Sequence, residues 1–414
     1  MELDSMVKKC RQASYSLSLV DGKIKNNILL KMADLLEASA SSINEANQQD
    51  IKAAVKAGLN EAIIDRLTLT PARIKSTADG LRLVAGLKDP VGEVIKQWRR
   101  PNGLLIRKVR VPIGVIFMIY ESRPNVTVDS AGLCFKSGNC VILRGGKESI
   151  NSNRVLVDIL HQVLEDNGIK KECIQFIDNP DHSIIPQLLK MSSYIDLVIP
   201  RGGAGLIDLV VRESQIPVIK HYKGICHIYV DKDADLDMAE KIVLNAKTQR
   251  PGVCNAVETL LIHKDIAGVF LPRIAGKLRV ANVELRGCPR TEKIITDIKK
   301  AVEQDWAAEY LALILAIRIV DDLDSAVAHI NKYGSMHSDS IITSNQQVAD
   351  RFGREVDSAC VFVNASTRFS DGGQFGMGAE IGISTDKIHA RGPMGLEELT
   401  GYKYVITGNG QIRE

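Results

Sequence analysis

The chain has 414 residues, of which 45% are apolar and 25% charged, and its formal net charge at neutral pH is only +3. This length exceeds what one hydrophobic core usually holds, so we expect two or three lobes. The interspersed charges offer no basic patch for nucleic acid or an anionic membrane, and we find neither a signal peptide nor the ~18 uninterrupted apolar residues of a membrane span.

The eight cysteines are spread singly, without a CxxC pair or a His/Cys cluster at metal-ligand spacing. Such a pattern is typical of reduced thiols in a cytosol and not of a disulfide framework or a zinc site. We therefore expect a cytoplasmic protein without a bound metal. A small anionic substrate is compatible with the charge balance.

Residues 5–87 are predicted to form consecutive helices, because apolar positions recur at three and four spacing and Thr70 with Pro71 makes a helix start. A β-hairpin is predicted over 92–112, where two strand-like runs flank "RPNG". A long ribbon of this kind is marginal alone, so it should lie against another lobe or another subunit.

From residue 113 onward, short apolar runs alternate with amphipathic helical segments, which indicates parallel sheets covered on both faces. The predicted fold is therefore α/β, with one lobe over 1–236 and a second over 237–370. Residues 371–414 read as a glycine-rich loop and one last strand that returns to the first lobe and its hairpin.

Cys254 is the cysteine best placed for chemistry. It lies in "QRPGVCNAVETLL", where a turn containing Pro and Gly runs into an apolar strand, so it should be partly exposed near outward-facing N–H groups. A nucleophilic thiolate needs such surroundings. Four of the other cysteines lie within apolar runs, where a thiol acts as a small hydrophobe: Cys134, Cys140, Cys226 and Cys360.

Two glycine-bearing turns follow strands and precede helices, which suits the approach of a phosphate or a nicotinamide to a helix N-terminus. One is "IPRGGAGLI" and the other is "ILRGGKE", and neither has the spacing of the dinucleotide fingerprint. The same glycines are what any tight strand-to-helix turn requires, so both interpretations stay open. The residues concerned are Arg144, Gly145, Lys147, Arg201, Gly202 and Gly203.

Polar residues elsewhere offer further candidates. In "YESRPNVT", Asn125 could donate to an oxyanion and Arg123 could meet an anionic substrate, although either could instead cap a helix. In "NKYGSMHSDSI", His337 and Ser338 suit helix capping or substrate contacts better than zinc, because no acidic or thiol partner stands at ligand spacing.

Taken in order, these stretches resemble the aldehyde dehydrogenase superfamily and, within it, the gamma-glutamyl phosphate reductases. The similarity covers residues 111 to 400 and is most specific in "QRPGVCNAVET" and between Val320 and Ile341. It implies two Rossmann-like lobes, a hairpin used for oligomerisation, and NADPH-dependent reduction of L-glutamyl 5-phosphate to glutamate 5-semialdehyde with release of phosphate, the second step of proline biosynthesis.

The resemblance also implies residue roles. Cys254 would be the nucleophile that forms a thioester, and Asn125 with the Cys254 N–H would form the oxyanion hole. Glu309 falls where the superfamily holds the nicotinamide ribose, and Arg144 replaces the lysine that usually contacts the adenosine ribose. We further expect Arg123, Arg250, His337 and Ser338 to contact substrate, a homo-oligomer, and a transient partnership with glutamate 5-kinase, which makes the labile acyl phosphate.

One departure separates this chain from hydrolytic relatives. They carry a glutamate that activates water four residues before a "GGK" lysine, whereas the corresponding run here is "VIKHYKG", with Ile219 at that position. The alternatives are a hydrolytic aldehyde dehydrogenase, which Ile219 opposes, and a non-catalytic protein that keeps the fold. A redox-sensing thiol protein is a third, although no resolving cysteine lies close to Cys254 in sequence.

Overall fold

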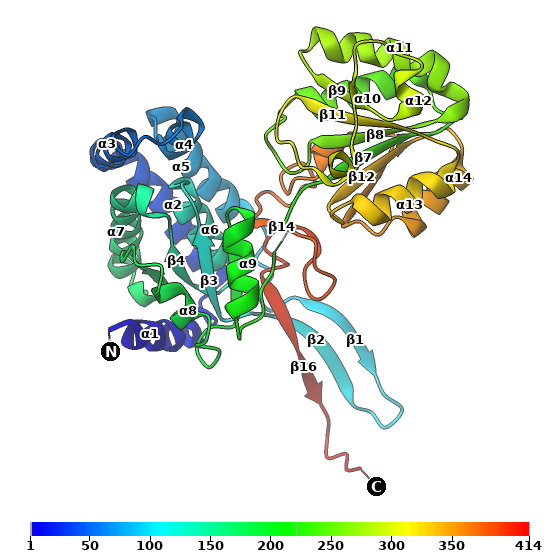
Figure 1. The fold of residues 1–414 in the computed structure, drawn as a ribbon. Coiled ribbons are helices and arrows are strands. Elements are labelled where there is room, and N and C mark those ends of the chain that lie inside the picture. Colours follow the sequence, from blue (N-terminus) through cyan, green and yellow to red (C-terminus); the bar gives the residue numbers. More distant parts are fainter. Residues whose placement is uncertain (1, 221, 414) are drawn as a thin grey trace. The chain divides into compact units, whose positions relative to one another are not determined.

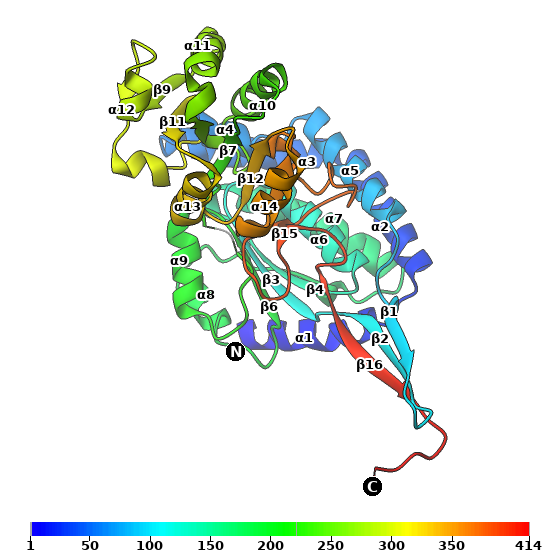
Figure 2. The same ribbon diagram turned by 90° about the vertical axis from the view of Figure 1, so that its right-hand side faces the viewer.

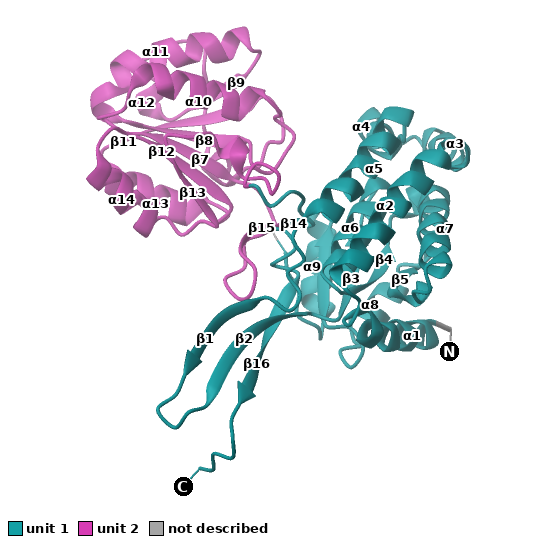
Figure 3. Cartoon of the chain, turned by 180° about the vertical axis from the view of Figure 1, so that it is seen from behind, with its two compact units in different colours: residues 1–220, 376–382, 394–414 teal, residues 221–375, 383–393 magenta. Residues whose placement is uncertain are grey.

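The computed structural model describes residues 2–220 and 222–413. It divides into two compact units, coloured separately in Figure 3. The first unit holds residues 1–220, 376–382 and 394–414, and the second holds 221–375 and 383–393. The sequence suggested a boundary at 236, but β7 (Cys226–Val230) pairs with β8 (Val257–His263) in the second sheet, so the division falls earlier.

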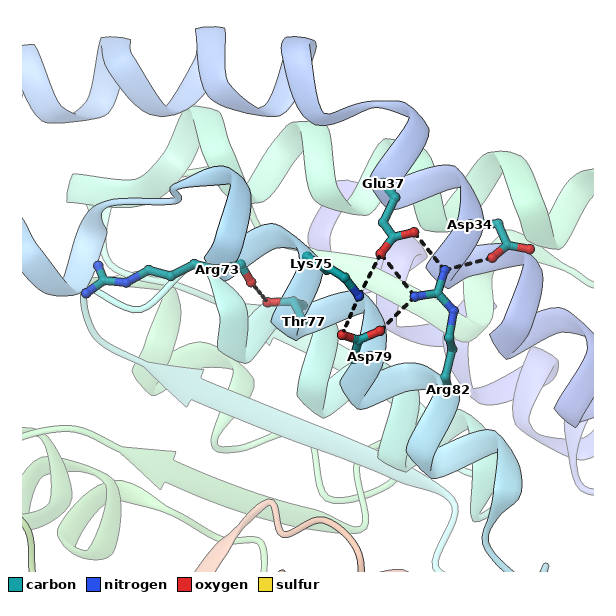
Figure 4. Close-up of polar contacts among 7 residues, drawn as sticks. All are labelled: Asp34, Glu37, Arg73, Lys75, Thr77, Asp79 and Arg82. Carbon is teal, nitrogen blue, oxygen red and sulfur yellow. Dashed lines mark hydrogen bonds and ion pairs between the residues drawn. The ribbon is translucent and has the colours of Figure 1, made fainter.

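The first unit begins with the predicted run of helices. These are α1 (Glu2–Leu17), α2 (Gly22–Ala38), α3 (Ala40–Lys56), α4 (Glu61–Leu67) and α5 (Pro71–Gly86). Thr70 caps α5 as the sequence indicates, since its side chain accepts a hydrogen bond of 3.2 Å from the Arg73 N–H. Arg82 of α5 binds Asp34 and Glu37 of α2 and Asp79 of its own helix, and these bonds join the two helices at the surface (Figure 4).

A four-stranded parallel sheet forms the centre of the first unit, in the order β5-β4-β3-β6. Its strands are β3 (Val115–Tyr120), β4 (Cys140–Arg144), β5 (Ile174–Phe176) and β6 (Leu197–Arg201). The α-helices between and after them are α6 (Asn125–Lys136), α7 (Ile150–Asp166), α8 (Ile184–Leu188) and α9 (Ala204–Glu213). The chain runs outward from β3 to β5 and then returns to place β6 on the other side of β3. This reversal is the topological switch point at which open α/β sheets bind ligands.

A separate antiparallel ribbon also belongs to the first unit. It consists of β1 (Val94–Arg99), β2 (Leu105–Pro112) and the C-terminal strand β16 (Thr400–Thr407), in the order β1-β2-β16. Its turn is the predicted one, with Gly103 at a φ of 91°. The ribbon extends away from the helices of its unit in both Figure 1 and Figure 2. Along it, the rings of Trp98 and Tyr404 meet edge to face at 6.2 Å.

The second unit is built on a seven-stranded parallel sheet, in the order β10-β9-β11-β8-β7-β12-β13. Figure 1 shows α10 and α11 over one face of this sheet and α13 and α14 over the other. Both faces are therefore buried, and the strands carry apolar residues on each side. The elements not yet named are β9 (Glu284–Gly287), β10 (Lys299–Lys300), β11 (Ile314–Val320), β12 (Ser338–Ile342), β13 (Cys360–Val363), α10 (Leu236–Thr248), α11 (Lys264–Val280), α12 (Pro289–Glu292), α13 (Leu323–Tyr333) and α14 (Gln346–Glu355).

Short elements complete the chain. Four are 3-10 turns and two form a small sheet near the end: η1 (Lys147–Ser149), η2 (Lys171–Cys173), η3 (Glu303–Ala307), η4 (Thr367–Phe369), β14 (Gly382–Ser384) and β15 (Gly392–Met394). None of the helices found in residues 2–220 and 222–413 combines the length and apolar character needed to cross a bilayer. The two parallel sheets and the ribbon are the α/β architecture that the sequence predicted.

Candidate active site

Cys254 lies on the turn between α10 and β8, and it is the one cysteine among the eight that is partly exposed. The preceding turn contains Pro251 and Gly252, which end α10 and lead the chain to the start of the strand. The seven other thiols are buried, as the sequence indicated for the four within apolar runs. The Cys254 thiol is therefore accessible to a small molecule, while the turn that carries it is anchored to β8.

The backbone beneath Cys254 is tightly packed. A Cβ built on Gly224 would lie 1.9 Å from the Cys254 carbonyl oxygen, so only glycine allows the two segments to meet here. The Cys226 thiol also reaches that oxygen, at 3.2 Å. On the far side of the turn, Thr367 donates to the Asn255 carbonyl at 2.8 Å. The nucleophile candidate therefore stands on a fixed turn.

Glu309 is joined to the same support. Its Oε1 accepts a 2.8 Å hydrogen bond from the Gly224 N–H, the residue whose Cα packs against Cys254. Burial raises the pKa of the Glu309 carboxyl, and the Gly224 N–H opposes that shift. Through this contact Glu309, which the sequence resemblance assigns to the nicotinamide ribose, is linked to the Cys254 turn within one unit.

A buried ion pair joins the two ends of the Cys254 turn, the end of α10 and the start of β8. Lys247, at the end of α10, donates to Oε2 of Glu258 at 2.6 Å and to the Val257 carbonyl at 2.9 Å, and both charged side chains are fully buried. The other Glu258 oxygen accepts from the Leu311 N–H at 3.3 Å. Burial raises the pKa of Glu258 to about 7 and lowers that of Lys247. Sequence reasoning missed this pair, although "K" and "E" eleven residues apart bracket the cysteine.

His337 and Ser338 differ from the sequence expectation. Both are fully buried at the start of β12, where the His337 Nδ1 lies 2.9 Å from the Ser338 hydroxyl and 3.8 Å from the Cys226 thiol. The buried His337 side chain packs beneath the Cys254 turn, next to Cys226, and is not exposed to a substrate. The polarity of the two residues suggested helix capping or substrate contacts, because the sequence alone does not reveal that β12 lies between β7 and β13.

Asp339, the next residue of β12, is also fully buried, and it binds His227 through both the backbone N–H and the ring Nδ1 at 2.7 and 2.9 Å. The polar run around His337 thus makes its hydrogen bonds to other buried groups inside the protein. In the part of the chain that the structure describes, no group of three or more His, Cys, Asp or Glu side chains is arranged to hold a metal ion.

Arg250 and Arg368 lie on the two sides of the Cys254 turn. Arg250 precedes the turn and is exposed. Arg368 comes from η4, and its Nε donates to the side chain of Gln249 at 2.9 Å while its carbonyl accepts from the Asn255 amide at 3.4 Å. The sequence suggested Arg250 but not Arg368, because the contact that brings η4 here spans more than a hundred residues.

The first unit gathers the other candidates at the carboxyl ends of its strands. Arg201 ends β6, and Gly202 and Gly203 follow it; the Gly203 N–H donates to Glu121, the residue after β3, at 3.0 Å. Space around Gly203 is open, since a Cβ there would meet only a Glu121 oxygen at 4.0 Å. These loops flank the switch point between β3 and β6.

The two cations at the carboxyl end of β4 differ in exposure: Arg144 ends the strand, and Lys147 lies in the loop after it. Arg144 is almost fully buried and donates to the Pro180 carbonyl at 3.1 Å, and burial lowers its pKa. Lys147 is exposed at the start of η1. Gly145 between them is required by packing, because a Cβ there would lie 2.2 Å from the Asn153 amide nitrogen.

Asn125 begins α6 and is half-buried, and its amide Nδ2 donates to Oδ2 of Asp129 at 2.9 Å. The bond fixes the direction of the amide, and burial raises the pKa of Asp129 to about 6. Arg123 is exposed two residues earlier. Ile219 is buried, and its N–H pairs with the Val198 carbonyl at 3.0 Å, so the position has no carboxylate; His221 in the same run lies outside the described residues.

Comparisons with known proteins agree on one family. The model of the aldehyde dehydrogenase family matches residues 1–293. Gamma-glutamyl phosphate reductase of Caldanaerobacter subterraneus subsp. tengcongensis is 54% identical over 414 residues, which is 100% of both chains. The crystal structure of gamma-glutamyl phosphate reductase from Thermotoga maritima has a TM-score of 0.98 at 48% identity and covers 100% of both chains.

A more distant structure shares the fold. Glyceraldehyde-3-phosphate dehydrogenase from Methanocaldococcus jannaschii, complexed with NADP, has a TM-score of 0.68 at 15% identity, over 99% of this chain and 94% of that one. The two parallel sheets and the ribbon of the present chain are therefore an aldehyde dehydrogenase fold, as the sequence resemblance implied.

Proposed function

Since the chain belongs to the gamma-glutamyl phosphate reductases of the aldehyde dehydrogenase family, we propose that it reduces L-glutamyl 5-phosphate to glutamate 5-semialdehyde through a thioester on Cys254. It is an oxidoreductase of proline biosynthesis. The main observation in support of this mechanism is the position of Cys254. Its thiol is partly exposed, and its backbone packs tightly against Gly224.

In the first step the Cys254 thiolate attacks the acyl carbon of the substrate. The bond between that carbon and the phosphate oxygen breaks, phosphate leaves, and a thioester remains. Asn125 and the Cys254 N–H are the proposed donors to the oxyanion, and a side-chain donor of this kind is worth on the order of 3 kcal/mol in other enzymes. The bond from Asn125 to Asp129 orients the amide before substrate arrives.

The loops after β3, β4 and β6 fit a nicotinamide cofactor. They lie at the switch point of the sheet, carry the open backbone at Gly203, and add the cations Arg201 and Lys147. When bound, NADPH supplies the hydride that takes the thioester to the aldehyde level. The archaeal relative in complex with NADP supports the assignment, and Glu309 is proposed for the nicotinamide ribose.

Resolution of the thioester by water would yield glutamate and waste the acyl phosphate. Ile219 is buried and offers no general base at the position where hydrolytic relatives carry the glutamate that activates water. This supports a reductase over the hydrolytic alternative. Release of the aldehyde returns Cys254 to the thiolate.

Two partnerships belong to the same proposal. The ribbon of β1, β2 and β16 leaves Tyr402, Tyr404 and Ile406 exposed, which suits burial against another copy of the chain in a homo-oligomer. The lability of an acyl phosphate favours a transient contact with the glutamate 5-kinase that makes it. Size-exclusion chromatography with light scattering would test the first partnership.

The deciding experiment follows the reverse reaction, in which glutamate 5-semialdehyde and NADP give NADPH, with and without inorganic phosphate. We expect strict dependence on phosphate, because phosphate must resolve the thioester. Equal rates without phosphate would replace the reductase with a hydrolytic dehydrogenase. Cys254→Ser should still bind NADPH, measured by fluorescence, but lose turnover; retained turnover would remove Cys254 from the mechanism.

A further inference from the structure

The turn that carries Cys254 is clamped on both sides by η4. Before the cysteine, Gln249 accepts from Nε of Arg368 at 2.9 Å, and after it, Asn255 binds η4 through its carbonyl and its amide. The amide of Asn255 also donates to the Ser370 carbonyl at 2.9 Å. These bonds hold η4 against both ends of the turn that carries the partly exposed thiol, and the bond to Gln249 fixes the direction of the Arg368 guanidinium.

A second guanidinium, that of Arg250, follows Gln249 directly in the chain and is exposed. Burial lowers the pKa of Arg368 first, and repulsion from Arg250 lowers it further, whereas Cys254 and Asp371 act in the opposite sense. The Asp371 carboxylate is already bound by the N–H groups of Gly373 and Gln374. Two like charges repel each other, and an anion bound between them would relieve that repulsion.

We propose that Arg368, together with Arg250, forms the site for the phosphoryl group of the substrate. The inference rests on the proposed function and adds a residue that the sequence did not reveal. A phosphate dianion carries the charge that two guanidinium groups match, and Arg presents its donors in a planar fork suited to phosphate oxygens.

The pair serves both directions of the reaction. In reduction, the carbon–oxygen bond to phosphate breaks as sulfur adds to the acyl carbon, and the electron pair leaves with the phosphate between the two guanidinium groups. In oxidation, an oxygen of inorganic phosphate in that position attacks the thioester carbon, and the carbon–sulfur bond breaks to release the thiolate. Arg368 is thus a substrate-binding residue of the same site.

The test measures alkylation of Cys254 by iodoacetamide in the protein without cofactor, as inorganic phosphate is added. Phosphate should protect the wild-type thiol, and Arg368→Met should need about 10- to 100-fold more phosphate for the same protection. Arg368→Lys should fall between the two, because the charge stays but the bond from Nε to Gln249 is lost. Arg354→Met, at an exposed arginine of α14, is the matched control and should behave as wild type.

In the reverse reaction, Arg368→Met and Arg368→Lys should raise the KM for phosphate. The KM for NADP should stay within about twofold, since Arg368 is not assigned to the cofactor. Equal protection and equal phosphate KM in wild type and Arg368→Met would overturn the inference while leaving the reductase intact. Absence of any phosphate dependence in the wild type would instead remove the proposed function itself. Thermal melting of Arg368→Lys and Arg368→Met identifies a variant that fails through folding.

Discussion

Gly224 and Cys254 meet backbone to backbone. A Cβ built on Gly224 would lie 1.9 Å from the Cys254 carbonyl oxygen and 2.5 Å from its Cα, both shorter than any normal contact. The Gly224 N–H at the same time donates to Glu309 at 2.8 Å. Gly224 therefore fixes both the position of the Cys254 backbone and that of the Glu309 carboxylate, which is proposed to bind the ribose.

Gly224→Ala should displace the Cys254 turn, because the obstructing atoms belong to the backbone and not to a flexible side chain. A shift near 1 Å is enough to lower kcat about 100-fold. Steady-state kinetics and the rate of Cys254 alkylation would measure it. Gly276→Ala, inside α11 with nothing within 4 Å, is the control and should keep activity while gaining about 0.5 to 1 kcal/mol of stability. Wild-type kcat in Gly224→Ala would refute the argument.

The sequence predicted the exposed Cys254 because its signals are local: a Pro and Gly turn directly before an apolar strand. Arg368 escaped prediction because its contacts with Gln249 and Asn255 join segments more than a hundred residues apart. The sequence suggested helix capping or substrate contacts for His337 and Ser338, because "SMHSDSI" is polar. Inside the sheet the His337 Nδ1 lies against the Ser338 hydroxyl, a contact that no periodicity reveals.

Removing one member of the buried pair should be costly. Lys247→Met leaves the Glu258 carboxylate without its cation, and losses of about 3 to 5 kcal/mol are usual for a broken buried pair. Urea unfolding at pH 8 would measure the loss. Because burial already raises the pKa of Glu258 to about 7, the carboxyl can take up a proton, and the loss should shrink at pH 6. Lys247→Met with Glu258→Gln should recover part of it; a double variant worse than the single would contradict this account.

Asp129 should make folding stability depend on pH. Its folded pKa of about 6 lies above the ordinary carboxyl value of about 3.8, so the folded chain holds the proton more tightly than the unfolded chain. The contribution to stability is present below pH 4 and is lost as pH rises through 6. Asp129→Asn keeps an acceptor for the Asn125 amide and should abolish that dependence, gaining on the order of 2 kcal/mol relative to wild type between pH 4.5 and 7.5. Parallel unfolding curves at every pH would count against the assignment.

The network around Arg82 should matter little and respond to salt. Its partners Asp34, Glu37 and Asp79 lie at the surface between α2 and α5, as Figure 4 shows. Exposed ion pairs contribute up to about 1 kcal/mol each and are screened by ions. Arg82→Met should therefore lower the free energy of unfolding only slightly in dilute buffer and by less in 1 M NaCl. A loss that does not change with salt would point to packing of the alkyl chain instead.

The preference between NADPH and NADH should depend on Lys147 more than on Arg144. The resemblance assigns the adenosine ribose to Arg144, yet that side chain is 5% exposed, donates to the Pro180 carbonyl and is disfavoured as a cation by burial. Lys147 follows in the same loop and is exposed, so its ammonium can approach a 2′-phosphate without desolvation. Lys147→Met should lower kcat/KM with NADPH about tenfold and leave that with NADH unchanged. Arg144→Met should lower the melting temperature and affect both cofactors alike, because it breaks a bond within the protein. If Arg144→Met alone removes the preference, the buried guanidinium must turn outward when the cofactor binds.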